Sequence, residues 1–327
     1  MRLNATSACA RCTGGAMIKQ LSWRMAQALF VVLAVGLLTW LLVQALPGDM
    51  AWRIASGRYG YDRVDADAVA RVQQELDGAL SGGSALLHWL FDLLQFNFGR
   101  SLVSGEPVMD ELRWQLGQTL ALAGVSLLLA LLLTLPLGIW AGCHANGRLD
   151  RALFWLTALL KSVPHFALGM LLILLFALQL DWLPSAGHGE LRHFLLPALT
   201  LALSLTTVGV RVVREATWQV VSSGYYRWGA QKGLSPARLL LRHGLRNLSA
   251  PVLTWFGMQF VWLVEGVVVV ETLFAWPGIG HALVHAIFAR DVPVIQASAM
   301  TLGLLFVLLN MLVDAGCHLL DPRGARA

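Results

Sequence analysis

The chain has 327 residues, of which 57% are hydrophobic and only 13% are charged. Soluble globular domains carry about twice that share of charged residues, so this balance points to a protein embedded in a lipid bilayer. It excludes a disordered chain and a basic nucleic-acid-binding tail. The net charge of +5 would suit an acidic partner, but its meaning depends on where the Lys and Arg residues lie relative to the apolar segments.

Six apolar segments are long enough to cross a bilayer, which takes roughly 20 helical residues. We expect the third of these segments, Phe154–Leu180, to kink at Pro164, just after Lys161. The alternative, a set of buried helices in a large soluble protein, would need polar elements to cover them, and too little sequence remains. The predicted transmembrane helices are Ala26–Leu46, Thr119–Ala141, Phe154–Leu180, Phe194–Val210, Leu248–Val270 and Val292–Val313.

The Lys and Arg residues lie unevenly around these segments. An even number of spans puts both termini on one side, which holds 16 of the 24 basic residues, against 8 on the other side. Seven of the 16 lie between Arg211 and Arg246. Since basic loops stay in the cytoplasm, we expect both termini there. The positive charge therefore indicates topology, and nucleic acid is not expected as a partner.

This topology divides the chain into a cytoplasmic tail (1–25), a first span (26–46), an outer loop (47–118), a core (119–314) and a cytoplasmic C-terminal tail (315–327). The outer loop has an acid-rich stretch with helical spacing, Ala51–Leu80, and an aromatic-rich one, Leu86–Phe98. Trp and Phe beside charges next to a span are typical of an interfacial helix. A lid over a binding site is the alternative.

The cysteines give no complete metal site. Cys9 and Cys12 form a CxxC without a second pair nearby, and Cys143 and Cys317 lie on predicted cytoplasmic segments, where disulfides are not expected. A basic, amphipathic stretch begins at Met17, so translation starting there would remove the CxxC altogether.

Several ionisable side chains lie in or beside the predicted spans, where such groups are functional candidates. Glu265 falls inside the fifth span and Glu271 at its end, and both are candidates for the transport pathway. A carboxylate paired with a neighbouring helix is the alternative for Glu265, and a structural brace for Glu271. Two histidine pairs could contribute metal ligands, but two ligands make a weak site, so the metal ligands stay unassigned. The pairs are His281 with His285 and His188 with His193.

The inner loop Arg211–Asn247 carries the clearest local signals. Ser222-Ser223-Gly224 should end the fourth helix, and a short helix, Tyr225–Lys232, should stop at Gly233, a residue suited to the left-handed conformation. Ser235-Pro236 then begins a basic helix, Ala237–Asn247. A short helix held between two spans can dock into a groove on a cytoplasmic partner. An ordinary basic loop is the alternative.

The same loop reads YYRWGAQKGLS from Tyr225 to Ser235, followed by LLRHGLRN up to Asn247. Other motifs follow one another along the chain: LPGD at Leu46–Asp49, FGRSL at Phe98–Leu102, PLGIWA at Pro136–Ala141, WLP at Trp182–Pro184, ETLFAWPGIG at Glu271–Gly280 and LDPR at Leu320–Arg323. In this order they resemble the permeases of ABC importers of the dipeptide, oligopeptide and nickel class, over nearly the whole chain from Met17.

The resemblance implies an all-α membrane protein with six transmembrane helices and the architecture of a type I ABC importer permease. It implies a second, related permease subunit, two cytoplasmic ATPase subunits and a periplasmic binding protein as partners. The chain lacks a phosphate-binding GxxxxGK[ST] motif, so we expect ATP and Mg to be used by the partner subunits, with no cofactor on this chain and no enzymatic activity of its own. The residues that the resemblance assigns to ATPase coupling are Tyr225, Tyr226, Arg227, Trp228, Gly229, Ala230, Gln231, Lys232, Gly233 and Leu234.

The loop departs from the acidic-Ala-Ala motif of such permeases, because Arg227, Trp228 and Gly229 stand at its three positions. Peptide-class permeases commonly carry Arg in place of the acid. Glycine in place of the last alanine should loosen the helix by roughly 0.5 to 1 kcal/mol.

Three segments resemble the nickel permeases most: Pro136–Ala141, Trp182–Gly189 with His193, and Phe274–Gln296. We therefore expect uptake of nickel or a related divalent metal, bound to a small chelator. Di- or oligopeptide uptake is the alternative. A stand-alone channel, a scaffold or an intramembrane protease would be different classes, and no catalytic motif within the spans supports the last.

Overall fold

The computed structural model describes residues 22–39, 41, 49–60, 64–80, 91, 95 and 97–320. In this part of the chain all regular structure is helical, apart from one isolated β-bridge between Arg100 and Pro107. The chain forms two compact units, which are described separately. The first comprises Met1–Arg113 with Ala282–Met311, and the second comprises Trp114–His281 with Leu312–Ala327.

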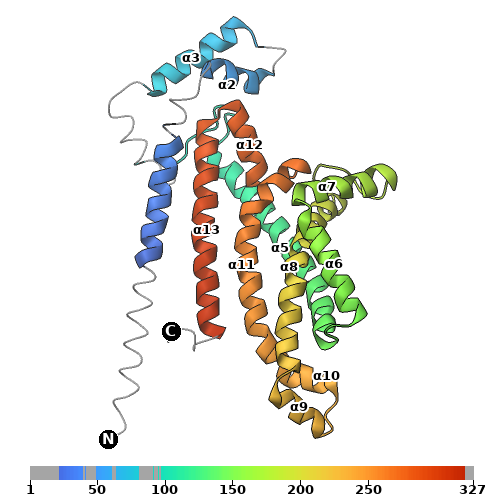
Figure 1. Ribbon diagram of the computed structural model, residues 1–327. Helices are drawn as coiled ribbons and strands as arrows, with labels where there is room; N and C mark the ends of the chain where they lie inside the picture. Colours follow the sequence, from blue (N-terminus) through green and yellow to red (C-terminus); the bar gives the residue numbers. More distant parts are fainter. Residues whose placement is uncertain are drawn as a thin grey trace, which may run out of the picture. The chain divides into compact units, whose positions relative to one another are not determined.

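In the first unit, α2 (Met50–Tyr59) and α3 (Ala66–Leu80) pack together through Ile54 and Val72, which are almost fully buried (Figure 1). The Asp49 carboxylate caps α2 by accepting a hydrogen bond from the Trp52 N–H at 3.2 Å. Arg58 on α2 forms a 2.8 Å ion pair with Glu75 on α3, which raises the pKa of the Arg58 guanidinium. The helical spacing in the outer loop therefore predicted α3 correctly.

The first unit also contains the helix over Ser22–Thr39 and most of α13 (Val292–Leu320). Gly303 on α13 faces Val31 so closely that a Cβ at this position would lie 2.6 Å from the valine side chain. Glycine is needed here because the Val31 side chain packs directly against the backbone of α13.

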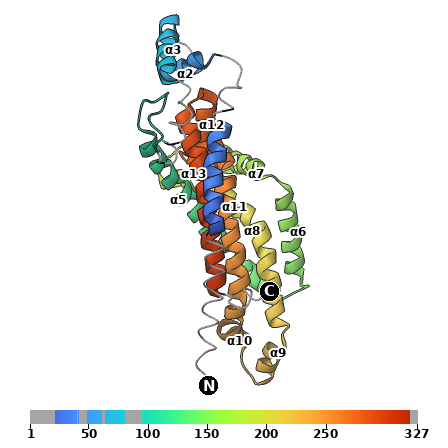
Figure 2. The same ribbon diagram turned by 90° about the vertical axis from the view of Figure 1, so that its left-hand side faces the viewer.

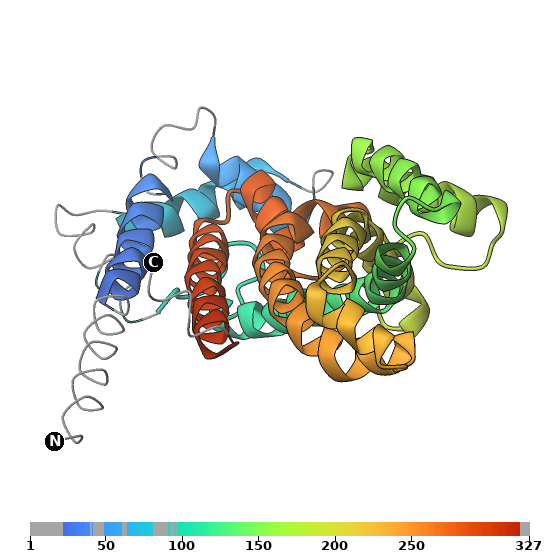
Figure 3. The ribbon, with the colours of Figure 1, turned by 60° about the horizontal axis from the view of Figure 1, so that its bottom comes forward.

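The second unit is built around α8 (Leu191–Val221), which contacts α6, α7, α9 and α11. Figures 1 and 3 show α8 between α11 on one side and α6 on the other. Three helices of α5 to α11 contain an interior proline: Pro136 in α5, Pro197 in α8 and Pro251 in α11. The remaining elements of this unit are α5 (Val108–Cys143), α6 (Arg148–Ser162), α7 (His165–Leu172), a π-helical segment η2 (Ile173–Gln179), α9 (Gly224–Gln231), α10 (Pro236–Leu239), a π-helical segment η3 (Leu240–Gly244) and α11 (Leu245–Leu273), with α12 (Ile279–Ala289) starting at its edge.

Four of the described helices are long and apolar enough to cross a membrane, and two bent pairs bring the number to six if each pair is one span. Each of the six overlaps one of the six predicted segments, with different bounds. The helices α6 and α7 meet at an angle of 100°. The break between them contains Val163 and Pro164, which confirms the predicted kink. The second span is longer than expected, because α5 begins at Val108 and not near Thr119; Asp110 and Glu111 suit its first turn.

Several sequence predictions lie outside the described residues. They include the CxxC at Cys9 and Cys12, the stretch around Met17 and the C-terminal LDPR motif. Most of the aromatic-rich segment Leu86–Phe98 is also outside them, so the predicted interfacial helix and its alternative, a lid, both stay untested.

Candidate functional site

The short helix α9 lies where α8 ends and before α10 begins (Figure 2). Ser223 separates α8 from α9, and its hydroxyl donates to the Val220 carbonyl at 2.5 Å. Gly233 ends α9 with φ +81°. The Gly233 N–H donates to the Ala230 carbonyl and the Leu234 N–H to the Gly229 carbonyl, at 3.0 and 3.3 Å. This pair of hydrogen bonds is the Schellman motif, and it confirms the predicted helix and its stop at Gly233.

One face of α9 is anchored to its neighbours. Tyr226 is buried against Val220 of α8 and Leu239 of α10, and burial raises the pKa of its phenol. Its hydroxyl donates to the Pro236 carbonyl at 3.3 Å. Gly229, one turn on, lies against Leu239, and a Cβ built there would overlap the leucine side chain. The glycine thus permits a close helix contact, a reason for it that the sequence analysis missed.

The other face of α9 is exposed. Trp228 is 60% and Tyr225 43% exposed, and the Lys232 ammonium lies 3.6 Å above the Trp228 ring. Such a contact fixes the indole and places positive charge beside it. Arg227 is exposed on the same helix. We call Tyr225, Arg227, Trp228 and Lys232 the exposed face of α9; aromatic and arginine side chains of this kind are typical of the centres of protein interfaces.

The end of α8 that leads to α9 is held by charged contacts. Arg214 forms a 2.9 Å ion pair with Asp150 of α6, and Arg211 lies 4.6 Å over the Phe154 ring. Two glycines of α5, Gly138 and Gly142, sit so close to α8 that no Cβ would fit without displacement. These contacts hold the end of α8 against α5 and α6.

Glu271 lies at the other end of α11 and is fully buried. Its carboxylate accepts hydrogen bonds from the Thr119 hydroxyl at 2.6 Å, the Gly280 N–H at 2.8 Å and the His281 N–H at 3.2 Å. The Thr119 oxygen in turn accepts the Ile279 N–H at 2.9 Å. Glu271 thereby joins α5, the end of α11 and the start of α12, where a carboxylate is favoured by the helix dipole.

The other candidate residues from the sequence, Glu265 and the histidines, lie on separate elements. Glu265 lies on α11, but its side chain is outside the described part. His281 contacts Glu271 through its backbone, and His193 lies beside Gly187. Among the described residues no group of three or more His, Cys, Asp or Glu side chains is arranged to hold a metal ion.

A second buried carboxylate, in the first unit, was not singled out from the sequence. Asp291 accepts hydrogen bonds from the Leu102 and Val103 N–H groups at 3.1 and 3.2 Å and from the Ser101 hydroxyl. Ser101 and Asp291 are 5% and 3% exposed. These hydrogen bonds tie the FGRSL motif to the start of α13, a pairing that the sequence pattern did not indicate.

Four to six helices that are long and apolar enough to cross a membrane, in the described part of the chain, define a multi-pass membrane protein. Residues 134–326, more than half of the chain, match the family of binding-protein-dependent transport system inner membrane components, and the chain belongs to that family. It is thus the permease subunit of an ABC importer.

Curated relatives agree over most of the chain. A glutathione transport system permease protein from Salmonella choleraesuis is 38% identical over 291 residues, which cover 89% of this chain and 94% of the relative. The glutathione permease of Escherichia coli K12 is also 38% identical, over 88% of this chain and 92% of its own length. A probable peptide ABC transporter permease from Sinorhizobium fredii is 35% identical over 92% of this chain and 97% of its own length.

The fold is similar to that of a solved ABC transporter. A chain of the MetNI methionine transporter, in an inward-facing conformation, aligns with a TM-score of 0.58 and 17% sequence identity, covering 66% of this chain and 99% of that chain. The likeness supports the type I ABC importer permease fold.

Proposed function

We propose that this chain is one permease subunit of an importer for short peptides, glutathione among them, and that it moves them across the inner membrane by alternating access. The relatives that match over about nine tenths of the chain are named as glutathione or peptide permeases. They favour the peptide alternative over the nickel uptake expected from the sequence. The described residues also offer no cluster of metal ligands.

The geometry of α9 is the observation that carries the coupling role. Its inward side, Tyr226 and Gly229, is fixed on α8 and α10, while its exposed face is free to meet another protein. In this proposal the segment Tyr225–Leu234 docks on a cytoplasmic ATPase subunit. ATP and Mg are bound by two such subunits and not by this chain.

The other partners and the topology belong to the same proposal. A second, related permease completes the pathway, and a periplasmic protein delivers the peptide. Both termini lie in the cytoplasm with α9, because 16 of the 24 Lys and Arg residues fall on that side. The segments 1–25, 26–46, 47–118, 119–314 and 315–327 then form the tail, first span, periplasmic loop, core and second tail.

In this proposal, the contacts around α9 transmit its movement to the transmembrane helices. Closure of the ATPase pair would shift α9 as a rigid piece, because the Schellman motif fixes its end and Tyr226 its side. Arg214 would pass the shift to α6 through Asp150. This is a rigid-body transition between two states of the bundle.

The two carboxylates of α11 take different roles. The three donors around Glu271 support a structural brace at the junction of α11 and α12. Glu265, a carboxylate within the fifth span, stays a proposed pathway residue.

Uptake by the complete transporter tests the proposed function. The chain is co-expressed with the ATPases, permease and binding protein encoded beside it. The purified complex is reconstituted into vesicles, with ATP on the side of the membrane that carries the ATPase subunits. ATP-dependent uptake of radiolabelled glutathione or dialanine is the expected result. Uptake of a nickel chelate without peptide uptake, or purification with no ATPase attached, would overturn the proposal.

A further inference from the structure

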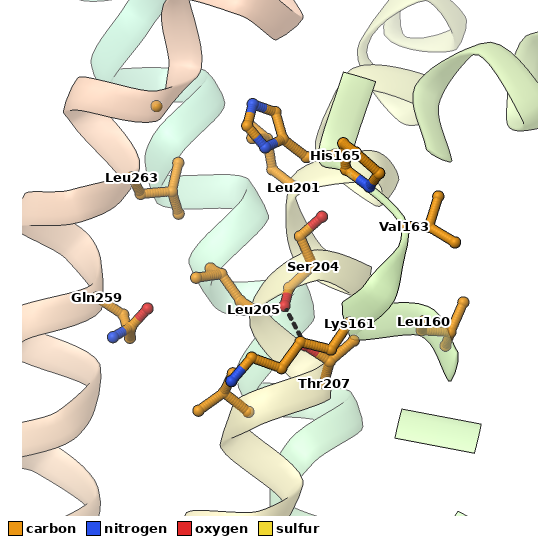
Figure 4. A pocket seen from close by; sticks show the side chains of 13 residues that line it. Leu160, Lys161, Val163, His165, Leu201, Ser204, Leu205, Thr207, Gln259 and Leu263 are labelled. Atoms are coloured by element: carbon orange, nitrogen blue, oxygen red, sulfur yellow. Dashed lines mark hydrogen bonds between the residues drawn. The ribbon is translucent and has the colours of Figure 1, made fainter. Parts of the chain in front are cut away.

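A cavity of about 410 Å³ lies within the second unit, at the bend between α6 and α7 (Figure 4). Side chains of α6, α7, α8 and α11 line it, and its volume falls in the range that accommodates small ligands. Most of the wall is apolar, for example Leu201 and Leu263. The polar side chains among its lining residues are Lys161, His165, Ser204, Thr207 and Gln259.

The cavity begins about one helical turn before the charged end of α8. Thr207 precedes Arg211 by four residues, or about 6 Å at 1.5 Å per residue. Arg211 lies over the Phe154 ring and Arg214 is paired with Asp150, so both are already engaged. Lys161 is a further positive charge, within the third predicted span. Charged groups in a span are retained mainly where they act on a ligand or a pathway.

Two nitrogen groups of the cavity, in Lys161 and His165, could pair with an anion. Lys161 forms no ion pair with any carboxylate in the described part of the chain. The His165 Nε2 is buried and has no hydrogen-bond partner there. Figure 4 shows Lys161 reaching from α6 past Thr207 toward the α11 side, with His165 entering from α7. A buried polar group such as the His165 nitrogen is unfavourable without a partner. An anion here would accept a hydrogen bond from the Nε2–H form of His165 and pair with the exposed Lys161 ammonium.

The polar groups of α8 in this cavity are hydrogen-bond acceptors. The Ser204 hydroxyl donates to the Thr200 carbonyl at 3.0 Å, and the Thr207 hydroxyl donates to the Ser204 carbonyl at 2.7 Å. Since each hydroxyl proton is already used, the oxygens can only accept from a ligand. Gln259 on α11 can both donate and accept. The cavity thus combines donors for an anion with acceptors for N–H groups.

We propose that this cavity binds a short peptide during transport, with a carboxylate of the peptide at Lys161 and His165 and its N–H groups toward Ser204, Thr207 and Gln259. The proposal rests on the proposed peptide uptake. A divalent cation fits poorly, because the Lys161 ammonium would repel it. An anion without N–H groups would use only half of the site.

The charge preference of the cavity can be measured without relying on what the binding protein delivers. In the assembled transporter, Cys9, Cys12, Cys143 and Cys317 are replaced by serine and Ser204→Cys is introduced, because Ser204 lines the cavity and is partly exposed. Methanethiosulfonate reagents of equal size but opposite charge then label the new thiol. Ser222→Cys at the end of α8, outside the cavity, is the matched control.

We expect the ratio of anionic to cationic labelling rates to be roughly tenfold higher for Ser204→Cys than for Ser222→Cys. Lys161→Gln should abolish this preference and Lys161→Arg should retain it, while the Ser222→Cys ratio stays constant. S-methylglutathione or dialanine should slow the labelling of Ser204→Cys, and their carboxyl esters should not.

Equal labelling by the two reagents, or equal protection by the peptides and their esters, would overturn the proposal. Either result could occur in a transporter that still imports peptide. Absence of peptide uptake by the wild-type transporter would instead contradict the proposed function, so the two failures are distinguishable.

Discussion

Glu271 and Thr119 are joined by a 2.6 Å hydrogen bond although 152 residues separate them in the chain. Both are fully buried, and the same carboxylate receives two backbone N–H groups at the start of α12. The contact fixes the ends of α5 and α11 to each other. It gives the ETLFAWPGIG motif a physical role, because Gly278 leaves room beside the carboxylate that any Cβ would fill.

Glu271→Ala is therefore expected to lower the stability of the purified protein by at least about 2 kcal/mol, since it leaves buried donors without an acceptor. Glu271→Gln keeps an acceptor and should cost less. Thr272→Ala is the control, because that neighbouring side chain is exposed. Thermal unfolding in detergent measures all three, and equal melting temperatures for Glu271→Ala and Thr272→Ala would contradict the role of the brace.

Asp291→Ala should release the turn that contains Ser101. The Leu102 and Val103 N–H groups lose a charged acceptor worth roughly 1.5 to 3 kcal/mol, so their hydrogen exchange should accelerate by about 10- to 100-fold. Glu106→Ala, in the same turn but exposed, should leave exchange unchanged. Unaltered exchange at Leu102 in Asp291→Ala would show that the carboxylate does not hold the turn.

Gly229→Leu should separate α9 from α10, because the new side chain would occupy the space of Leu239. Overpacking of this kind costs about 1 to 3 kcal/mol. Ala230→Leu places the same side chain on an exposed position of the same helix and should leave the melting temperature near that of the wild type. Comparable melting temperatures for the two variants would rule out the close contact.

Trp228→Ala removes the largest exposed side chain of α9. If this face docks on the ATPase, the affinity should fall by roughly 30-fold, the effect of about 2 kcal/mol at an interface centre. Trp182→Ala removes an exposed tryptophan at another site and should have no effect. Surface plasmon resonance of the permease with the isolated ATPase gives both values; equal affinities would argue against docking through this face.

Local signals in the sequence were sufficient for the helices. Pro164 marked the bend between α6 and α7, and Gly233 marked the end of α9, because each residue restricts or permits backbone angles regardless of its surroundings. The spans were recognisable because hydrocarbon thickness sets a minimum apolar length.

Contacts between distant segments could not be predicted. The pairing of Asp291 with Ser101, or of Glu271 with Thr119, depends on how helices pack, and one sequence holds no record of it. Gly229 shows the limit most clearly. Its helix propensity predicted a small loss of stability, whereas its contact with Leu239 gives it a packing role. Lys161 was recognised as a basic residue near a span but not as part of a cavity.

The number of peptides imported per ATP hydrolysed measures the proposed coupling through α9. Gly233→Val puts a β-branched residue at φ +81°, which strains the end of α9 by roughly 1 to 2 kcal/mol. Gly224→Ala is the control, since nothing lies within 4 Å of a Cβ at that position and its φ is not positive. In reconstituted transporter, Gly233→Val is predicted to keep its membrane insertion and ATPase activity while the ratio falls about tenfold. A ratio equal to that of Gly224→Ala and the wild type would contradict the account.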